Sequence, residues 1–493
     1  MTRERLIPLI VAVALFMENM DSTVIATSLP AIARDLGTDP LALKLAVTTY
    51  LLALAIFIPA SGWTADRFGA RTIFRAAIAV FMVGSIGCAL SQSLHYFVIA
   101  RFLQGMGGAM MSPVGRLVLV RSVDKRRLVD AMAWVSIPAL VGPVLGPPLG
   151  GFITTFLSWH WIFFINIPIG LLGVALATRY IDNFRAETRA PFDPLGMLLA
   201  GLGIAGVAFG LTAIGLKGFL PNGVLVALIA GGAVCICLYL LHARRVATPV
   251  IDLSLFRLPS FRAGVGGGFV FRVGAGAIPF LLPLMLQVGF GKTPFQSGLI
   301  TFASAVGAMC MKSVVATMLR RFGYRNVLTW NTLVSAGLIA AIALFTAATP
   351  VVIMLAVLFA GGFFRSLQFT SATTIGFAEI EPARMSRATS LAAVCQQLSV
   401  SMGVAVGAFT VELVRDFRHD GAIGAADFAP AFLMVACISA LSIFVFARMP
   451  VDAGAELTGR PIIPAVARPP TRGENAGAFR GGAPAQAQTD LAP

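Results

Sequence analysis

The sequence alternates long apolar runs with short polar segments. Fourteen apolar runs exceed about 17 residues, the length that a helix needs to cross the hydrocarbon of a bilayer. They lie at 7–30, 43–64, 72–92, 94–115, 129–155, 159–179, 194–215, 221–241, 263–287, 295–318, 327–347, 350–376, 388–412 and 428–447. The pattern therefore predicts an all-α polytopic membrane protein with fourteen spans.

The placement of Lys and Arg in the loops predicts the orientation of these spans. If both termini are cytoplasmic, 23 Lys and Arg lie in cytoplasmic loops or at the cytoplasmic membrane edge, and six lie on the opposite side. Cytoplasmic loops are the ones enriched in basic residues. We therefore expect a cell inner-membrane protein with both ends inside, and the alternation supports an even number of spans.

The composition excludes several classes of protein. Hydrophobic residues make up 57% of the 493 positions and charged residues only 12%, about half of what a soluble surface carries. The net charge of +15 is spread over loops rather than gathered in a patch, so we expect no nucleic-acid partner. All six cysteines fall in apolar runs, and no His or Cys shows metal-ligand spacing. We expect no metal and no cofactor.

One internal repeat predicts the domain organisation. RFGAR at 67–71 closes span two and RFGYR at 321–325 closes span ten, an offset of eight spans. Transporters are often built from parallel six-helix halves. An inserted helix pair reconciles the offset of eight spans with halves of six helices. The predicted order is a bundle at 1–190, a linking pair at 191–245 and a second bundle at 246–448. Residues 449–493, rich in Pro, Gly and Ala, predict a disordered cytoplasmic tail.

Five ordered motifs carry a family resemblance. They are MDSTVIATSLPAI in span one, GWTADRFGAR after span two, RFLQGMGGA in span four, GPVLGPPLGG in span five and WHWIFFINIPIG opening span six. Together they resemble the major facilitator superfamily, and within it the fourteen-span drug:proton antiporters of the EmrB/QacA type. The strings ASGW, GGAMM and SWHWIF resemble those of an MdtD-like branch of this family. The resemblance covers residues 7–447.

The resemblance implies roles for particular residues. Asp21 in span one would be the proton-coupling carboxylate, and Arg101 in span four would take part in proton transfer. The loop motif, with Asp66, Arg67, Gly69 and Arg71, would act as a gate latch between two conformations. The span-five motif, with Gly142, Gly146, Pro147, Gly150 and Gly151, accompanies export by antiport. A topological anchor and a tight helix crossing are the alternatives for these last two motifs.

The sequence departs from the family pattern at two places. The second copy of the loop motif has Arg320 where the first has Asp66, so only one half can make the carboxylate interaction. In span one, Ala26 and Thr27 replace the usual Asn-Val. The substrate contacts of that helix therefore do not carry over.

The residues themselves support a proton-coupling site in span one. Glu18 and Asp21 lie three residues apart, on one face of a helix. Ionisable groups at membrane depth are costly and usually line a cavity. Two carboxylates close together resist both being charged, so one of them could bind and release a proton near neutral pH. Arg101 cannot shuttle protons, but it can hold Asp21 ionised. A fixed structural ion pair is the alternative.

The second half carries three intramembrane cations. Arg272, Lys312 and Arg365 fall within spans nine, ten and twelve, and no acidic residue lies well inside those spans. If they face the central cavity, with Gln104 of span four, they would attract anions and repel lipophilic cations. The alternative is that Lys312 extends to the interface and Arg272 binds a backbone carbonyl.

The sequence thus predicts a monomeric, non-enzymatic, proton-coupled exporter of small molecules, with multidrug efflux as the first reading. No phosphate-binding loop or nucleophile motif argues for catalysis. The second reading keeps the fold and exchanges the cargo for an organic anion or metal chelate of the citrate type. A transport-inactive membrane sensor or scaffold is the third.

Overall fold

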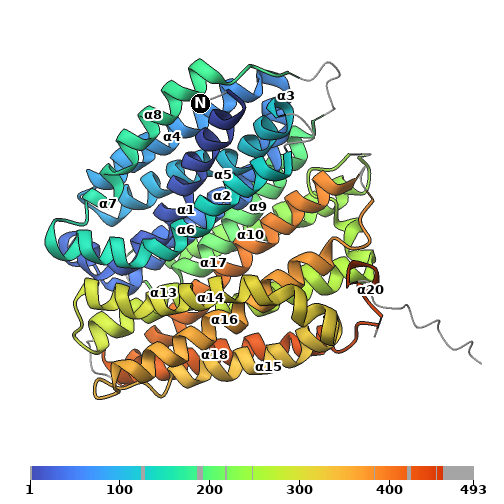
Figure 1. The fold of residues 1–493 in the computed structure, drawn as a ribbon. Helices are drawn as coiled ribbons and strands as arrows, with labels where there is room; N and C mark the ends of the chain where they lie inside the picture. Colours follow the sequence, from blue (N-terminus) through green and yellow to red (C-terminus); the bar gives the residue numbers. More distant parts are fainter. Residues whose placement is uncertain are drawn as a thin grey trace, which may run out of the picture.

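The computed structural model describes residues 3–123, 128–185, 192–216, 219–246, 248–381, 384–418, 423–450 and 452–458. In these ranges every regular element is a helix. The helices run roughly side by side in two bundles, one drawn blue to green and the other yellow to red (Figure 1).

The first bundle, called the N-terminal half here, contains α1 to α8. Its helices are α1 (Arg3–Asp35), α2 (Lys44–Phe57), α3 (Ser61–Phe68), α4 (Ala70–Ala89), α5 (Leu94–Ser122), α6 (Leu128–Phe156), α7 (Trp161–Phe164) and α8 (Asn166–Tyr180). The short 3₁₀ segments η1 (Pro40–Leu43) and η2 (Ile58–Ala60) join α2 to its neighbours, so span two is one interrupted rod. Pro59 within η2 accounts for the interruption, because proline cannot donate a helical hydrogen bond.

The second bundle, called the C-terminal half, begins with an interrupted span. Its helices are α11 (Pro259–Phe261), α12 (Gly268–Ala275), α13 (Ile278–Leu284), α14 (Pro294–Phe322), α15 (Tyr324–Ile342), α16 (Val351–Gly376), α17 (Met385–Arg418), α18 (Phe428–Leu441) and α19 (Ile443–Phe446). Two π-helical segments, η5 (Arg262–Gly267) and η6 (Met285–Gly289), belong to span nine.

The linking pair consists of α9 (Pro194–Ala213) and α10 (Asn222–Ala243). The two helices pack on each other, and α9 also contacts α2 of one half and α17 of the other. In Figure 1 they lie between the bundles. The division into two six-helix halves with an inserted pair stays a prediction.

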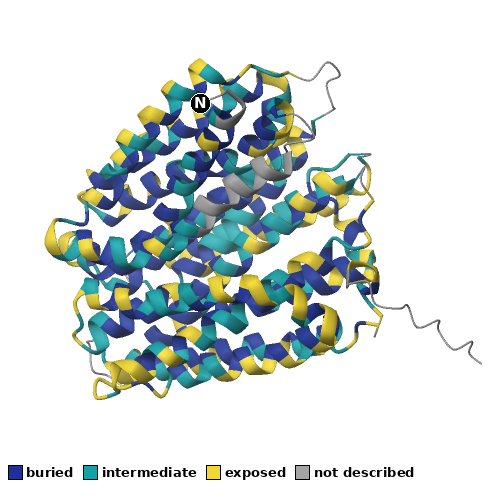
Figure 2. Cartoon of the chain, viewed as in Figure 1, coloured by how far each residue is buried: buried dark blue, intermediate teal, exposed yellow. Residues whose placement is uncertain are grey.

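The predicted spans are confirmed. Eleven helical segments among the described residues are long and apolar enough to cross a membrane. The helices α5, α6 and α15, of 29, 29 and 19 residues, complete fourteen. Exposed residues lie mainly on the outer surfaces of the bundles, and buried ones lie where helices pack on each other (Figure 2). Much of that exposed surface is apolar, as a lipid-facing surface must be.

The two copies of the loop motif share one backbone geometry. Gly69, between α3 and α4, has a φ of 98°, and Gly323, between α14 and α15, has a φ of 77°. Both values lie in the region that only glycine adopts readily. The sequence repeat therefore corresponds to a repeat of structure.

The predicted tail lies mostly outside the described residues. Of 449–493, the described part ends at 458 and includes the short helix α20 (Ala455–Thr458). Gly454 packs against Tyr324 and Ile375 of the C-terminal half. The first residues after span fourteen are therefore attached to the bundle.

We predict that Gly69→Ala lowers the stability of the purified protein. The methyl group would force a strained φ and collide with the amide of Asn183, whose oxygen accepts hydrogen bonds from the N–H and hydroxyl of Thr72. The strain alone costs about 1–3 kcal/mol. Thermal unfolding in detergent measures the effect.

Gly291→Ala is the matched control, because Gly291 also has a positive φ, 65°, with no atom near the added methyl group. The Tm should fall further for Gly69→Ala than for Gly291→Ala. Equal losses would contradict the collision with Asn183.

Candidate functional site

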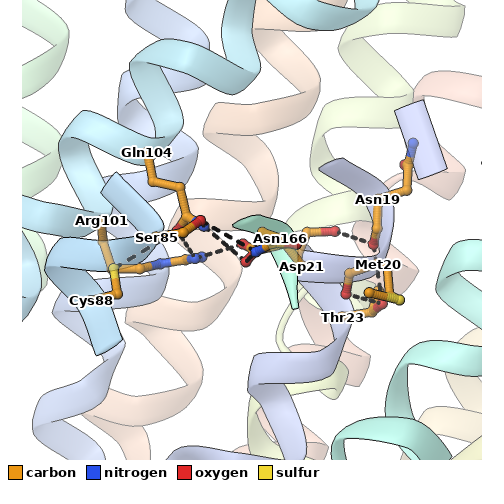
Figure 3. Close-up of polar contacts among 10 residues, drawn as sticks. Asn19, Met20, Asp21, Thr23, Ser85, Cys88, Arg101, Gln104 and Asn166 are labelled. Atoms are coloured by element: carbon orange, nitrogen blue, oxygen red, sulfur yellow. Dashed lines mark hydrogen bonds and ion pairs between the residues drawn. The ribbon is translucent and has the colours of Figure 1, made fainter. Parts of the chain in front are cut away.

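A buried ion pair joins α1 and α5 in the middle of the N-terminal half. Arg101 donates from Nη1 to Oδ2 of Asp21 over 2.8 Å, and each side chain is only 1% exposed. A charge buried in this way is tolerated only when it is paired. The structure thus brings together the two residues that the sequence analysis paired (Figure 3).

Two amide side chains complete the coordination of Asp21. Gln104 and Asn166 each donate from their side-chain nitrogen to Oδ1 of Asp21, over 2.8 and 2.9 Å. Both amides also donate to the hydroxyl of Ser85 on α4, over 2.8 and 3.3 Å. The Asp21 carboxylate of α1 thus accepts three hydrogen bonds from α5 and α8, and Ser85 connects α4 to the same network.

The network contains a hydrogen-bond acceptor without a partner. The oxygen Oδ1 of Asn166 is buried and makes no hydrogen bond to any described residue. Because the amide can rotate, Asn166 can donate to ionised Asp21 or accept from protonated Asp21. The site is thus compatible with both protonation states of the carboxylate.

Arg101 is held from its other side by an aromatic ring. Its Cζ lies 4.3 Å from the ring centroid of Tyr50 on α2, a cation–π contact. The Tyr50 hydroxyl is buried without a partner among the described residues. Arg101 therefore keeps a favourable contact when Asp21 is neutral.

Glu18 lies outside this network. It accepts a hydrogen bond of 2.9 Å from the hydroxyl of Ser112 on α5. A Cβ added at Gly108 would lie 3.2 Å from the Tyr50 hydroxyl and 3.8 Å from Cγ of Glu18, so these two side chains meet beside Gly108. Tyr50 thus contacts the guanidinium of Arg101 and lies near the same glycine as Glu18.

The glycines of the span-five motif form the contact surface between α6 and α1. A Cβ at Gly142, Gly146 or Gly150 would press against α1 between Phe16 and Thr27, the segment that carries Asp21. Gly151 points elsewhere, to the backbone of Pro294 at the start of α14. The carbonyl of Pro147 packs against Gly298 of α14. The motif therefore joins the segment of α1 that carries Asp21 to the opposite half.

The loop-motif residues form contacts within the N-terminal half. Arg121 of α5 donates to Asp66 over 2.9 Å, and Arg71 donates to the carbonyl of Ile181 over 3.3 Å. Arg67 lies over the rings of Trp63 and Phe68. These contacts fix the end of span two, and the latch between halves stays a prediction.

The three cations of the C-terminal half bind hydroxyl groups. Arg272 donates to Thr373 over 3.1 Å and Lys312 to Thr370 over 2.9 Å, both on α16, and Arg365 donates to Ser304 over 2.6 Å. Arg272 also lies 5.5 Å from the ring centroid of Phe369. No carboxylate of the described residues lies within ion-pair distance of these three cations. Arg272 and Lys312 gather on one stretch of α16, and Arg365 lies beside a separate cavity within the C-terminal half.

A second buried ion pair connects the two halves. Lys44 of α2 lies 2.8 and 2.7 Å from the two carboxylate oxygens of Glu412 on α17, and the side chains are 1% and 6% exposed. Lys44 also donates to the carbonyl of Ile214, just after α9, over 3.2 Å. Gly215, with a φ of 89°, packs directly on Glu412. Both halves and the linking pair thus share one ion pair.

Further cross-half contacts lie toward the same end of the molecule, which we call the Lys44 end. Arg415 of α17 pairs with Asp39. Gln287 donates to the carbonyl of Thr27 over 2.9 Å, and the backbone of Phe295 donates to the Thr155 hydroxyl over 3.1 Å. The halves are therefore joined at this end.

Sequence comparison identifies the family. The profile described as Major Facilitator Superfamily matches residues 11–403 and 264–480. The chain belongs to this superfamily. A protein named putative multidrug resistance protein MdtD from Salmonella heidelberg is 40% identical over 454 residues, 90% of this chain and 94% of its own length. The protein of the same name from Salmonella typhi matches to the same extent.

Solved structures share the superfamily fold. A D-xylose–proton symporter aligns with a TM-score of 0.65 at 15% identity, over 91% of this chain and 98% of its own. The human organic anion transporter MFSD10 aligns with a TM-score of 0.58 at 16% identity, over 90% and 100%. This chain is thus a multi-pass secondary transporter of small molecules, and the family resemblance seen in its motifs is confirmed.

Several site residues carry no distinctive sequence signal. Asn166 and Ser85 are common polar residues within apolar runs, although Asn166 lies in the WHWIFFINIPIG motif. Lys44 and Glu412 lie 368 positions apart, and from sequence each belongs to a span end. A buried pair between distant helices becomes visible only once the bundles are assembled.

We predict that Glu412→Gln strongly destabilises the protein. The change leaves the Lys44 ammonium buried without its counter-charge, and breaking a buried pair from one side costs about 3–5 kcal/mol. Thermal unfolding of the purified protein measures the loss. The double variant Lys44→Met with Glu412→Leu should recover most of it. A double variant as unstable as Glu412→Gln would contradict this account.

Proposed function

We propose that the protein exports small molecules across the bacterial inner membrane in exchange for protons, with several structurally unrelated drugs as substrates. The observation that supports this most is the buried Asp21–Arg101 pair with its three donors, in a fold that alternates between two openings. The 40% identity to proteins named MdtD supports multidrug substrates.

Asp21 is the proposed proton carrier. Ionised, it is bound by Arg101, Gln104 and Asn166. A proton on Asp21 removes the attraction to Arg101, whose guanidinium remains over the Tyr50 ring. The carboxyl O–H then donates to the Asn166 oxygen once that amide has rotated. Proton binding thereby replaces an ion pair that fixes α1 to α5 with neutral hydrogen bonds.

The glycine surface of α6 is the proposed means by which this change reaches the other half. Because Gly142, Gly146 and Gly150 allow close approach, α1 and α6 can move against each other without large side chains interlocking. Gly151 and Pro147 contact α14 directly. The loop motif with Asp66, Arg67, Gly69 and Arg71 serves as the latch at the cytoplasmic end, opposite the Lys44 end.

The remaining assignments follow from the charge distribution. With both termini cytoplasmic, the Lys44 end faces away from the cytoplasm, and the cross-half contacts there describe a state open to the cytoplasm. Glu18, beside Tyr50, supplies protons to Asp21. The exporter acts as a monomer, needs no cofactor besides the proton gradient, and catalyses no covalent reaction.

We predict that Asp21→Asn abolishes uphill transport because the isosteric amide cannot carry a proton. In proteoliposomes with an imposed pH gradient, drug accumulation should fall at least tenfold and substrate-induced proton movement should disappear. Because this variant leaves Arg101 without its ion-pair partner, the double variant Asp21→Asn with Arg101→Gln is tested beside it. Gel filtration checks that both variants are folded and not aggregated.

The matched control is Asp35→Asn, which changes a carboxylate on the same helix whose side chain is 55% exposed. It should transport like the unchanged protein. Full uphill transport by a well-folded Asp21 variant would falsify the proton-carrier role.

An organic anion or metal chelate is the second candidate cargo. Arg272 and Lys312 lie against neighbouring residues of α16 and have no carboxylate partner among the described residues. Uncompensated cations attract an anion and repel a cation. This placement favours a carboxylate-bearing substrate of the citrate type.

We predict that Arg272→Gln with Lys312→Gln selectively weakens anion transport. Citrate efflux from proteoliposomes should need at least tenfold more substrate, while efflux of a cationic dye should stay unchanged or improve. Arg257→Gln, at an exposed arginine, is the control for net charge. Equal losses for both cargoes, or for neither, would remove the anion reading.

A further inference from the structure

The C-terminal half contains a second copy of the Arg101 motif without its acid. Arg101–Phe–Leu–Gln104 of α5 recurs as Arg365–Ser–Leu–Gln368 in α16, the corresponding helix of the other half. In the first copy Asp21 neutralises the arginine. Span nine, which corresponds to the helix of Asp21, holds no Asp or Glu between 259 and 289. The second arginine therefore has no acid from that helix.

The second copy of the motif also belongs to a cluster of polar side chains, which Gln368 joins. Gln368 accepts a hydrogen bond of 2.7 Å from Asn331 and donates to the Thr332 hydroxyl over 2.8 Å, both on α15. Gln104 likewise binds a residue of the preceding span, Ser85. The two halves thus share a design in which glutamine binds the neighbouring helix and arginine extends beside it.

A small cavity lies beside Arg365, the arginine that lacks a carboxylate partner. It is bounded by α13, α14, α15 and α16, and the lining residues with polar side chains are Ser304, Ser335 and Arg365. Ile278, Leu338, Ile342 and Leu358 supply apolar walls. The space in the cavity is about 10 Å³. The cavity therefore holds one small particle.

Ser335 provides an independent sign that something occupies this cavity. Its side chain is 2% exposed, and its hydroxyl oxygen has no hydrogen-bond partner among the described residues. Arg365 donates to Ser304, a neutral group that leaves the positive charge uncompensated. An unsatisfied buried hydroxyl and an uncompensated guanidinium facing one cavity are both satisfied by the same ligand, an anion.

We propose that this cavity is a binding site for a monatomic anion, chloride, held by Arg365 and the hydroxyls of Ser304 and Ser335. A monatomic anion needs less of this space than a carboxylate group does. The ion replaces in the C-terminal half the charge that Asp21 supplies in the N-terminal half. The site stabilises the folded bundle, and it is independent of the cargo.

Halide-dependent thermal unfolding of the full-length protein in detergent tests the site, with no transport substrate present. Replacing sodium gluconate by sodium chloride at constant ionic strength should raise the Tm saturably, by roughly 2–4 °C. Bromide should act like chloride, and an anomalous signal from bromide should appear between Arg365 and Ser335 in crystals.

Three variants separate this site from general salt effects. Ser335→Val fills the cavity and Arg365→Gln removes its charge, so both should lose the halide-dependent rise while keeping or raising the Tm in gluconate. Arg272→Gln, which removes another intramembrane arginine, should keep it. If Arg365→Gln does not fold, Ser335→Val decides alone.

The proposal is overturned if the unchanged protein shows no halide-dependent rise, which would indicate a water molecule only. It is also overturned if Ser335→Val retains the rise, or if citrate raises the Tm where chloride does not.

Discussion

The cost of placing charge inside a bilayer governs the organisation of this protein. Each ionised side chain at membrane depth must find a partner or a water-filled space. Asp21 and Arg101 solve the problem with each other, on helices that lie 80 positions apart in sequence. The same pair fixes α1 to α5, orients two amides from α5 and α8, and holds Tyr50 of α2 by its ring. One electrostatic requirement thus assembles most of the N-terminal half.

Close helix packing connects the Asp21–Arg101 pair to the contact between the two halves. The glycines of α6 lie against the turns of α1 on both sides of Asp21, so the helix that carries the ionisable group packs on a surface of small residues. On the same stretch of α6, Pro147 and Gly151 reach α14. A change in charge at Asp21 and a displacement of one half against the other therefore involve the same short segment of chain.

The fold could be predicted from the sequence almost completely, because every span leaves an apolar run of recognisable length. Span two and span nine are interrupted in ways that hydropathy does not report, although Pro59, Pro279 and Pro283 mark the places. The Asp21–Arg101 pair was predictable because so few charges lie at membrane depth. Asn166, Tyr50 and the Lys44–Glu412 pair were not, since their roles depend on which distant helices meet. The predicted latch residue Asp66 pairs with Arg121 of the same half, and its contact across the halves stays a prediction.

The position of the linking pair restricts how the family could have gained or lost two spans. The backbone after α9 gives the Lys44 ammonium its third oxygen and covers the Glu412 carboxylate with a glycine. A chain without α9 and α10 would lose the cover over this bridge and one hydrogen bond to Lys44. The two additional spans are thus part of the contact that joins the halves at the Lys44 end. A twelve-span relative would have to replace the buried Lys44–Glu412 pair that they cover.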